Sequence, residues 1–258
     1  MKKLIISGGS IPHGGWNTWK DFVVDRYNIS EYHNLAKVGL GNESIINRAM
    51  IQASVVDNPI VIVMLTNIDK WDWYVNDCNI LKQVNKERHT ISPIHDGDEG
   101  GFWATGSHFP LFKEYYKKNY YTDVYQMIHT INGIIMLQGF CSSRDIPLLI
   151  LFDSPIFSCL EHELNENPMV IPTHDMLKSP TIKPYADLIN GIDDFRGLIG
   201  FCEDYDIPWY HPKFKGHPGS KAHHEFSKSR IFKWTDKFYN VVNPDQDAVA
   251  DKMNKLWD

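Results

Sequence analysis

The sequence predicts an α/β protein: a flavodoxin-like, three-layer α/β/α sandwich on about five parallel strands. Short apolar runs rich in β-branched residues recur along the chain, and a helical pattern follows each of them sooner or later. Strands that alternate with helices form parallel sheets that are covered on both faces. The composition, 43% hydrophobic and 22% charged, supplies enough apolar material for a sizeable core.

The five strands are predicted at 3–7, 31–38, 59–66, 147–153 and 207–210, where the apolar runs lie. The helices are predicted at 16–27, 43–56, 123–145, 185–204 and 220–241. In several of these helices apolar residues recur at the i, i+3, i+4 spacing of one helix face. Ile128, Ile131 and Ile135 are an example from the long helix at 123–145.

A length of 258 residues corresponds to about 1.7 average domains, so either two small domains or one domain with insertions would fit. Because strands and helices alternate throughout, a single domain over 1–258 fits better. Two stretches without a regular pattern, at about 69–118 and 155–184, follow predicted strands. We interpret them as insertions at the carboxyl edge of the sheet, where open α/β sheets bind ligands. The first insertion is rich in aromatic side chains that we expect to line a substrate pocket, among them Trp71, Trp73 and Trp103.

Charge and cysteine content narrow the class of partner and the compartment. A formal net charge of −6 leaves no basic surplus for nucleic acid or an anionic membrane, so neither is expected as a partner. No stretch of about 18 apolar residues could span a bilayer, and the apolar run at 4–6 is too short for a signal peptide. The four cysteines, which stand far apart and are expected as free thiols of a cytoplasmic protein, are Cys78, Cys141, Cys159 and Cys202.

Three residues with possible chemistry stand where predicted strands end. Ser10 follows Gly8-Gly9 after the first strand, and a serine in such a turn can expose its Oγ near backbone N–H groups. Gly39 follows the second strand, where glycine permits a positive φ or a close approach to a ligand. Asn67 follows the third strand, and its neutral amide could donate a hydrogen bond to an oxyanion.

Each of these residues also has an ordinary structural interpretation. Gly-Gly-Ser can be a turn with a helix N-cap, and Gly39 can belong to a helix-start turn that Asn42 caps. Asn67 can be a common strand-end residue. Taken one at a time, the residues do not distinguish a catalytic site from well-formed turns.

Two histidines could act as a general base beside Ser10. His217 begins a Pro-Gly turn before the last predicted helix, and imidazole is the side chain best suited to accept a serine proton near neutral pH. His13 lies three residues after Ser10 and is the rival base, or else a residue of the turn or the pocket rim. A histidine in a loop can also be incidental.

In this order along the chain, Ser10, Gly39, Asn67 and His217 resemble the pattern of the SGNH (GDSL-like) hydrolase superfamily, from about residue 3 to residue 240. NLAKVG and HPGSKAHHEF are similar to the second and last blocks of that family. The resemblance implies that Ser10 is the nucleophile and His217 the general base. It implies that Gly39 and Asn67 complete an oxyanion hole with the N–H of Ser10. The aromatic stretch and GFWATGSH resemble bacteriophage variants, which implies a virus-encoded protein made in the host cytoplasm.

The chain departs from this family at two positions. Gly9 stands where the family has the aspartate of its Gly-Asp-Ser block, and Phe214 stands where the triad aspartate would be, three residues before His217. The catalytic group is therefore either a Ser-His dyad or a triad with an acid from elsewhere. The acids nearest in sequence are Asp204, Asp206 and Glu225.

Neither a metal nor an organic cofactor is expected. The acidic run at 95–99, with His89 and His108 nearby, could offer oxygen ligands to a hard cation, but a solvated acidic loop explains it better. The glycine-rich turn after the first strand lacks both the Lys-Ser/Thr of a P-loop and the spacing of a dinucleotide fold.

The sequence thus leads to two functional hypotheses. The first is a serine esterase that hydrolyses an O-acyl ester of a small molecule or a glycan without any cofactor. The second is a catalytically weak or inactive module of the same fold that binds a glycan or a protein partner. The altered aspartate positions favour the second hypothesis, and the presence of all four family residues in order favours the first.

Overall fold

The computed structural model describes residues 2–13, 17–37, 39–68, 123–154, 180, 182–189, 192, 196–208, 217–247 and 250, and the backbone alone at 72–75, 92–93, 102–105, Ser10, His13 and Asp123. Four of the predicted strands are present: β1 (Lys3–Gly8), β2 (Tyr32–Asn34), β3 (Pro59–Leu65) and β7 (Leu148–Phe152). They form one open sheet in the order β2-β1-β3-β7, and every pairing in it is parallel. The predicted α/β class and parallel sheet are confirmed.

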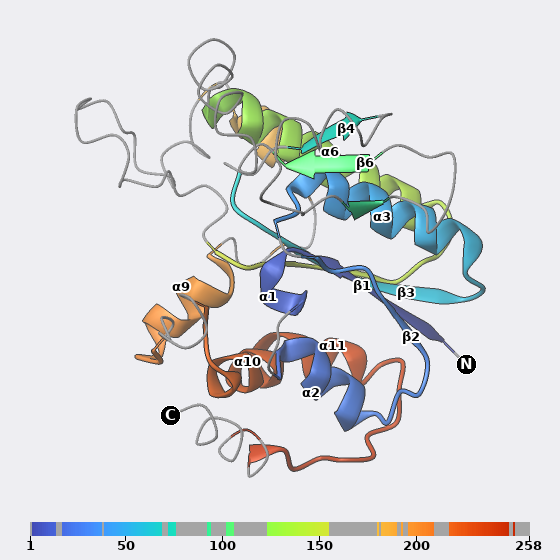
Figure 1. The fold of residues 1–258 in the computed structure, drawn as a ribbon, viewed down its shortest axis with the longest axis vertical. Helices are drawn as coiled ribbons and strands as arrows, with labels where there is room; N and C mark the ends of the chain where they lie inside the picture. The colour runs from blue at the N-terminus through green and yellow to red at the C-terminus, as the bar shows by residue number, and fades with distance from the viewer. Residues whose placement is uncertain are drawn as a thin grey trace, which may run out of the picture.

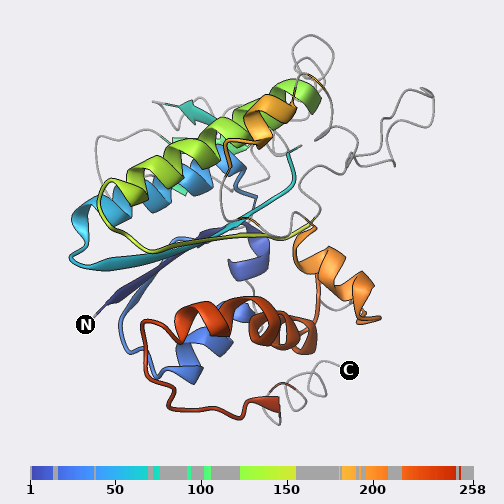
Figure 2. The same ribbon diagram turned by 180° about the vertical axis from the view of Figure 1, so that it is seen from behind.

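Helices cover both faces of this sheet, so the described part of the chain is layered as α/β/α (Figures 1 and 2). Ile5 of β1 packs into one core with α3 (Asn42–Val55) and α6 (Asp123–Ser142). Its neighbours Leu4 and Ile6 point to the other core. The elements of that second layer are α2 (Trp19–Arg26), α9 (Gly197–Asp204), α10 (Ser220–Phe226), the π-helical segment η4 (Ser227–Ile231) and α11 (Phe232–Thr235). Burial on both faces explains why β3 reads as an unbroken apolar run.

The fifth predicted strand is not present in its described half. Ile207 and Pro208 are outside any strand, and 209–210 lie outside the described residues. The N–H of Ile207 donates to Cys202 O at 2.8 Å, and Asp206 has a φ of 53°. A left-handed residue followed by such a bond ends a helix, so Ile207 terminates α9 instead of pairing with the sheet.

The predicted helix at 185–204 is two helices, α8 (Lys183–Ala186) and α9. Gly197 opens α9 with a φ of 66°, and a Cβ at this position would overlap the backbone of Phe152 at the end of β7. The chain therefore turns sharply against the sheet at Gly197, which prevents one continuous helix. The last predicted helix, at 220–241, ends earlier, at Thr235, and includes the π-helical turn of η4.

The first insertion contains strands that the sequence did not indicate. β4 (Asp72–Val75), β5 (Ser92–Pro93) and β6 (Phe102–Thr105) form a separate antiparallel sheet in the order β4-β6-β5. These strands depend on pairing between distant segments, which the irregular sequence pattern of 69–118 did not reveal. The acidic run at 95–99 lies outside the described residues, as does most of the second insertion, at 155–179 and 181.

One further element was not predicted, the short helix α1 (Ser10–His13) directly after β1. No helix in the described ranges is both long and apolar enough to cross a bilayer. Two of the four cysteines are described, Cys141 and Cys202, and both are buried free thiols, as expected.

Candidate active site at the carboxyl edge of the sheet

The turn that carries Ser10 is set by close packing around Gly8. A Cβ on Gly8 would overlap the Pro12 ring and lie 3.1 Å from Met64 O of β3. Pro12 is buried in α1, so the chain folds back tightly on the sheet at this point. Ser10 is consequently the first residue of α1, at the carboxyl end of β1 (Figure 1). Its side chain and that of His13 lie outside the described residues.

The loop after β2 lies beside this turn. The N–H of Lys37 donates to Gly8 O at 3.1 Å, and Gly39 has a φ of 83°, which glycine adopts without strain. A Cβ on Gly9 would lie 3.8 Å from both Leu40 O and the Thr66 Cβ. The ends of β1, β2 and β3 therefore meet around Gly9. Of the two roles that sequence reasoning allowed for Gly39, the positive φ is confirmed.

Asn42 joins two of these loops through a reciprocal pair of hydrogen bonds. Its Nδ2 donates to Thr66 O at 2.9 Å, and the Thr66 N–H donates to Asn42 Oδ1 at 2.8 Å. Both residues are buried. The predicted role of Asn42 as the helix cap was wrong, because Gly41 is the N-cap and Asn42 is the first residue of α3. Asn42 fixes the strand end that leads directly into Asn67.

Asn67 is half-buried at the end of β3, and its Oδ1 makes no hydrogen bond with another described residue. Its Oδ1 is the enclosed end of the amide. A side-chain amide normally finds partners when its polar atoms are buried. Asn67 directly follows Thr66, whose Cβ would lie 3.8 Å from a Cβ on Gly9, so its side-chain amide belongs to the strand end that adjoins the turn of Ser10.

His217 lies just before α10, in the helical layer on the second face of the sheet. It is half-buried and precedes the buried residues Pro218 and Gly219, of which Gly219 is the N-cap of α10. The pKa of His223 is lowered to about 3, first by complete burial of the ring and then by the positive charges of His217 and Lys20. Those two charges therefore act close to His223, on the face of the sheet that α2 and α10 cover.

Two of the three acids considered as partners for His217 are engaged elsewhere. Asp204 pairs with the Arg196 guanidinium on the exposed side of α9. Glu225 lies 3.4 Å from Lys228 Nζ, and Asp206 is exposed at the end of α9. Asp204 and Glu225 therefore each have a cationic partner other than His217.

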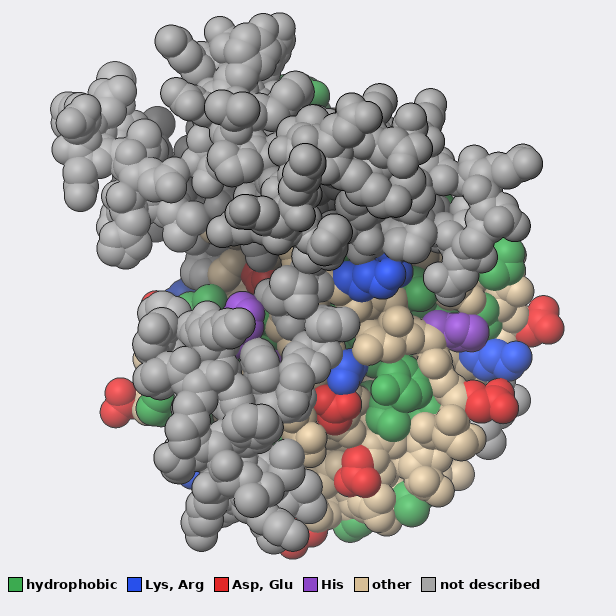
Figure 3. Space-filling model, in the orientation of Figure 1, with side chains coloured by type: hydrophobic (Ala, Val, Ile, Leu, Met, Phe, Trp, Pro, Cys, Tyr) green, Lys and Arg blue, Asp and Glu red, His purple; other side chains and the backbone are tan. Residues whose placement is uncertain are grey.

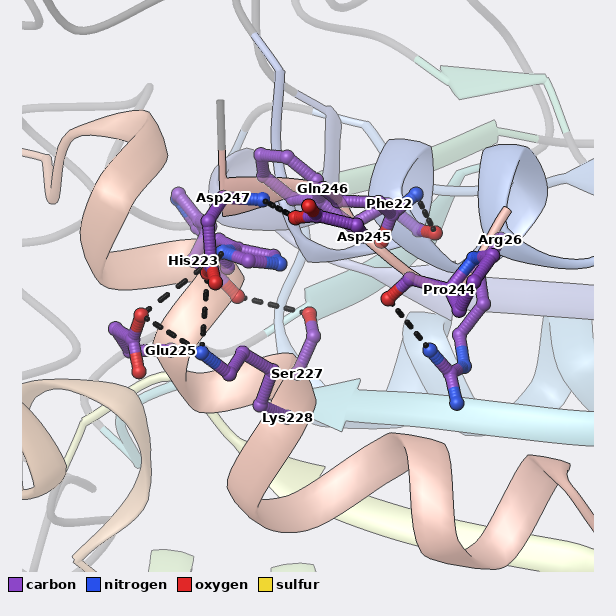
Figure 4. A network of polar contacts seen from close by, with 11 residues as sticks. Phe22, Arg26, His223, Glu225, Ser227, Lys228, Pro244, Asp245, Gln246 and Asp247 are labelled. Atoms are coloured by element: carbon purple, nitrogen blue, oxygen red, sulfur yellow. Dashed lines mark hydrogen bonds and ion pairs between the residues drawn. The ribbon is translucent and has the colours of Figure 1, made fainter. Parts of the chain in front are cut away.

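A second polar cluster on α10 has the composition of a metal site but already holds a cation (Figure 4). Ligand atoms of His224, Glu225 and Asp247 lie within 4.8 Å of one another. Lys228 Nζ stands between the two carboxylates, 3.0 Å from Asp247 and 3.4 Å from Glu225, and lowers the pKa of Asp247. The ammonium group bridges the two carboxylates and offsets part of their negative charge, so the cluster is a structural ion-pair network.

A pocket of about 360 Å³ lies between α3 and α6 and begins at Asn42. Apolar atoms make up most of its lining surface, and neutral amides, a hydroxyl and one His129–Glu43 contact of 3.2 Å supply the polar part. The lining residues are Asn42, Glu43, Ile46, Asn47, His129, Thr130, Asn132, Gly133 and Met136. The pocket was not predicted, since it depends on how the two helices cross.

The aromatic residues proposed for the substrate pocket are described only in part. Trp73 in β4 and Trp103 in β6 lie on paired strands, where Tyr74 is opposite Trp103, but their side chains are outside the described residues. Trp71 lies outside them altogether. On the face shown in Figure 3, the described acidic and basic side chains are interspersed.

Comparison with protein-family models finds none that matches this chain. A search of curated proteins likewise finds no match. Inference about function therefore depends on the site itself.

Proposed function

We propose that the protein is a serine hydrolase that cleaves an O-acyl ester, with Ser10 as nucleophile and His217 as general base. The observation that carries the proposal is the meeting of the three strand ends around Gly9, with Asn67 directly after Thr66 at one of these ends. This edge of a parallel sheet is where α/β proteins bind ligands.

The reaction proceeds through an acyl-enzyme. Ser10 Oγ attacks the ester carbonyl carbon while His217 accepts the hydroxyl proton. The N–H groups of Ser10 and Gly39 and the amide of Asn67 hold the negative oxygen of the tetrahedral intermediate. The bond to the alcohol then breaks, and its oxygen takes the proton from His217. Water, activated by His217, releases the acyl group from Ser10 as the acid.

The substrate we propose is an acylated carbohydrate. Support comes from the pocket between α3 and α6, because a largely apolar lining that also carries neutral amides and a hydroxyl suits both the C–H faces and the hydroxyl groups of a sugar. Asn42 belongs both to this pocket and to the hydrogen-bond pair that holds Thr66. A sugar bound there would contact Asn42, the residue that directly follows the Gly39–Gly41 turn.

Hydrolysis of p-nitrophenyl acetate and of acetylated oligosaccharides tests the proposal. We expect Ser10→Ala to abolish turnover of both substrates and Asn67→Ala to lower kcat by about 10²- to 10³-fold, the usual effect of losing one oxyanion donor. Ser143→Ala, which removes an exposed hydroxyl at the end of α6, is the matched control and should leave the rates unchanged. Turnover that survives in Ser10→Ala would refute the assignment of the nucleophile.

The alternative is a binding module that holds a glycan without cleaving it. The engagement of Asp204 and Glu225 by other cations favours this alternative, because these two carboxylates already have cationic partners of their own. Titration calorimetry with xylotetraose and chitotetraose separates the two functions. Binding by a wild-type protein that hydrolyses neither ester would support the module.

A further inference from the structure

The pocket between α3 and α6 is a groove that starts at the carboxyl edge of the sheet, on the face that these two helices cover (Figures 1 and 2). At that edge, Asn42 Nδ2 lies 3.5 Å from Thr130 Oγ1. Further along both helices, a Cβ on Gly133 would lie 2.8 Å from Ile46 Cδ1. Because the contacts advance together on both helices, α3 and α6 run parallel. The lining continues to Met136, so at a rise of about 1.5 Å per residue the groove extends about 9 Å beyond Thr130.

A carboxylate stands in this groove in a fixed orientation. Glu43 Oε2 lies 3.2 Å from His129 Nε2. The Tyr125 ring stacks on the His129 ring, with centroids 6.0 Å and planes 12° apart. The His129 contact uses only Oε2, whereas a carboxylate has two oxygens and about four acceptor sites. The Glu43 side chain is 39% exposed, so a ligand in the groove can donate hydrogen bonds to it.

Two amides farther along the groove add both donors and acceptors. Asn47 donates from Nδ2 to Glu43 O at 3.0 Å, which uses one of its two N–H donors. Asn132 is exposed on the α6 side of the groove, where its amide offers two donors and a carbonyl oxygen. The side chains of Ile46 and Met136 supply apolar surface between these polar groups.

We propose that this groove is the subsite for the sugar chain of the substrate, and that Glu43 and Asn132 determine its selectivity. The inference rests on the proposed function, because it assigns the sugar part of that substrate. Neighbouring sugar hydroxyls donate to the Glu43 carboxylate, and the Asn132 amide both donates and accepts. The C–H face of the sugar lies against Met136. The chain thus runs from Asn42 along the two helices, away from the strand ends.

The lining distinguishes a neutral sugar chain from other ligands of similar size. A phosphate or another anion would meet the negative Glu43, and the described lining residues include no lysine or arginine. A purely apolar ligand would take the carboxylate and the amides out of water without giving them partners, which costs free energy. A chain of hydroxyl groups and C–H faces satisfies both kinds of surface.

Calorimetric titration of Ser10→Ala protein with xylotetraose and chitotetraose measures this subsite without turnover. We expect at least one tetraose to bind. Glu43→Gln in the same background should weaken binding by about 5- to 20-fold, because a neutral amide accepts from hydroxyls less strongly than a carboxylate. Asn132→Ala should weaken it by about 3- to 10-fold. Glu31→Gln, which changes an exposed carboxylate before β2, is the matched control and should bind as the Ser10→Ala protein does.

Chemical modification locates the bound sugar. The His129 side chain is 47% exposed, so diethyl pyrocarbonate should modify it in the free protein. A saturating concentration of the tetraose that binds should largely abolish this modification, measured by peptide mass. His33 of β2, which lies 3.4 Å from Gln52, is the control and should react equally with and without sugar.

Three results would overturn the inference: binding of neither tetraose, binding that is unchanged in both Glu43→Gln and Asn132→Ala, or binding that leaves the modification of His129 unchanged. Fluorophosphonate labelling of wild-type Ser10 tests the proposed function separately. An unlabelled Ser10 together with tetraose binding that depends on Glu43 would refute the hydrolase and support the groove as a sugar site.

Discussion

Asn42→Asp tests directly whether the hydrogen-bond pair between Asn42 and Thr66 holds the loops of the site together. The variant keeps the shape of the side chain and the acceptor for the Thr66 N–H, but it loses the donor to Thr66 O. A carboxylate oxygen then faces a buried carbonyl oxygen, with Asn42 only 4% exposed. One unsatisfied buried acceptor costs about 1–3 kcal/mol, and burial of the new charge adds to it, so we expect a loss of about 2–4 kcal/mol at pH 8.

The pH dependence of that loss follows from the protonation of the new side chain. Burial raises the pKa of an introduced carboxyl above its value in the unfolded chain, so the stability that it retains is present at low pH and lost as pH rises. A protonated carboxyl can donate to Thr66 O as the amide did. The deficit relative to wild type should therefore shrink between pH 8 and pH 4.5.

Urea unfolding at these two pH values measures the effect. Asn47→Asp is the control, because its amide donates to Glu43 O within the same helix at only partial burial, and it should cost less than about 1 kcal/mol. Asn42→Asp should also slow fluorophosphonate labelling of Ser10 more than the control does. A deficit below about 0.5 kcal/mol at pH 8, or one that is equal at both pH values, would contradict the reasoning.

The remaining predictions concern glycine, histidine and cysteine positions. Gly8→Ala should cost about 1–3 kcal/mol through overlap with the Pro12 ring, whereas Gly9→Ala has room for its Cβ and should change stability by less than about 1 kcal/mol, both measured by urea unfolding. The folded-state pKa of His223 is about 3, below its ordinary 6.5, so the unfolded chain binds more protons between these values. Stability should fall as pH drops through that window, by up to about 1.4 kcal/mol per pH unit, and His223→Leu should flatten the fall while leaving stability at pH 8 equal or higher. Burial raises the pKa of Cys141 to about 11 and of Cys202 to about 12, so iodoacetamide at pH 8 should modify neither thiol, by peptide mass, until urea unfolds the chain.

The strands of the main sheet could be predicted because their signal is local. β1, β3 and β7 are each within one residue of the predicted ends, since burial on both faces requires an apolar run whatever the rest of the chain does. The second strand was predicted over 31–38, but β2 stops at Asn34. The chain leaves the sheet there to form the loop of Gly39, and the Leu35 and Lys37 N–H groups still bond to β1.

In the candidate site, too, residues with a local sequence signal could be predicted and residues that depend on distant contacts could not. The positive φ of Gly39 and the position of Asn67 follow from their place at strand ends, which the sequence alone indicates. The role of Asn42 could not be found from the sequence, because it depends on which distant group the fold brings near its amide. An amide directly after the Gly39–Gly41 turn was the only available signal.

The most direct test of the central claim is the site of covalent modification by a fluorophosphonate. Intact-mass measurement followed by peptide sequencing should find one phosphonyl group per chain, located on Ser10, with none in Ser10→Ala or in urea-unfolded protein. A folded protein that stays unlabelled under conditions in which a control serine hydrolase is fully labelled, or that is labelled at another serine, would contradict the account.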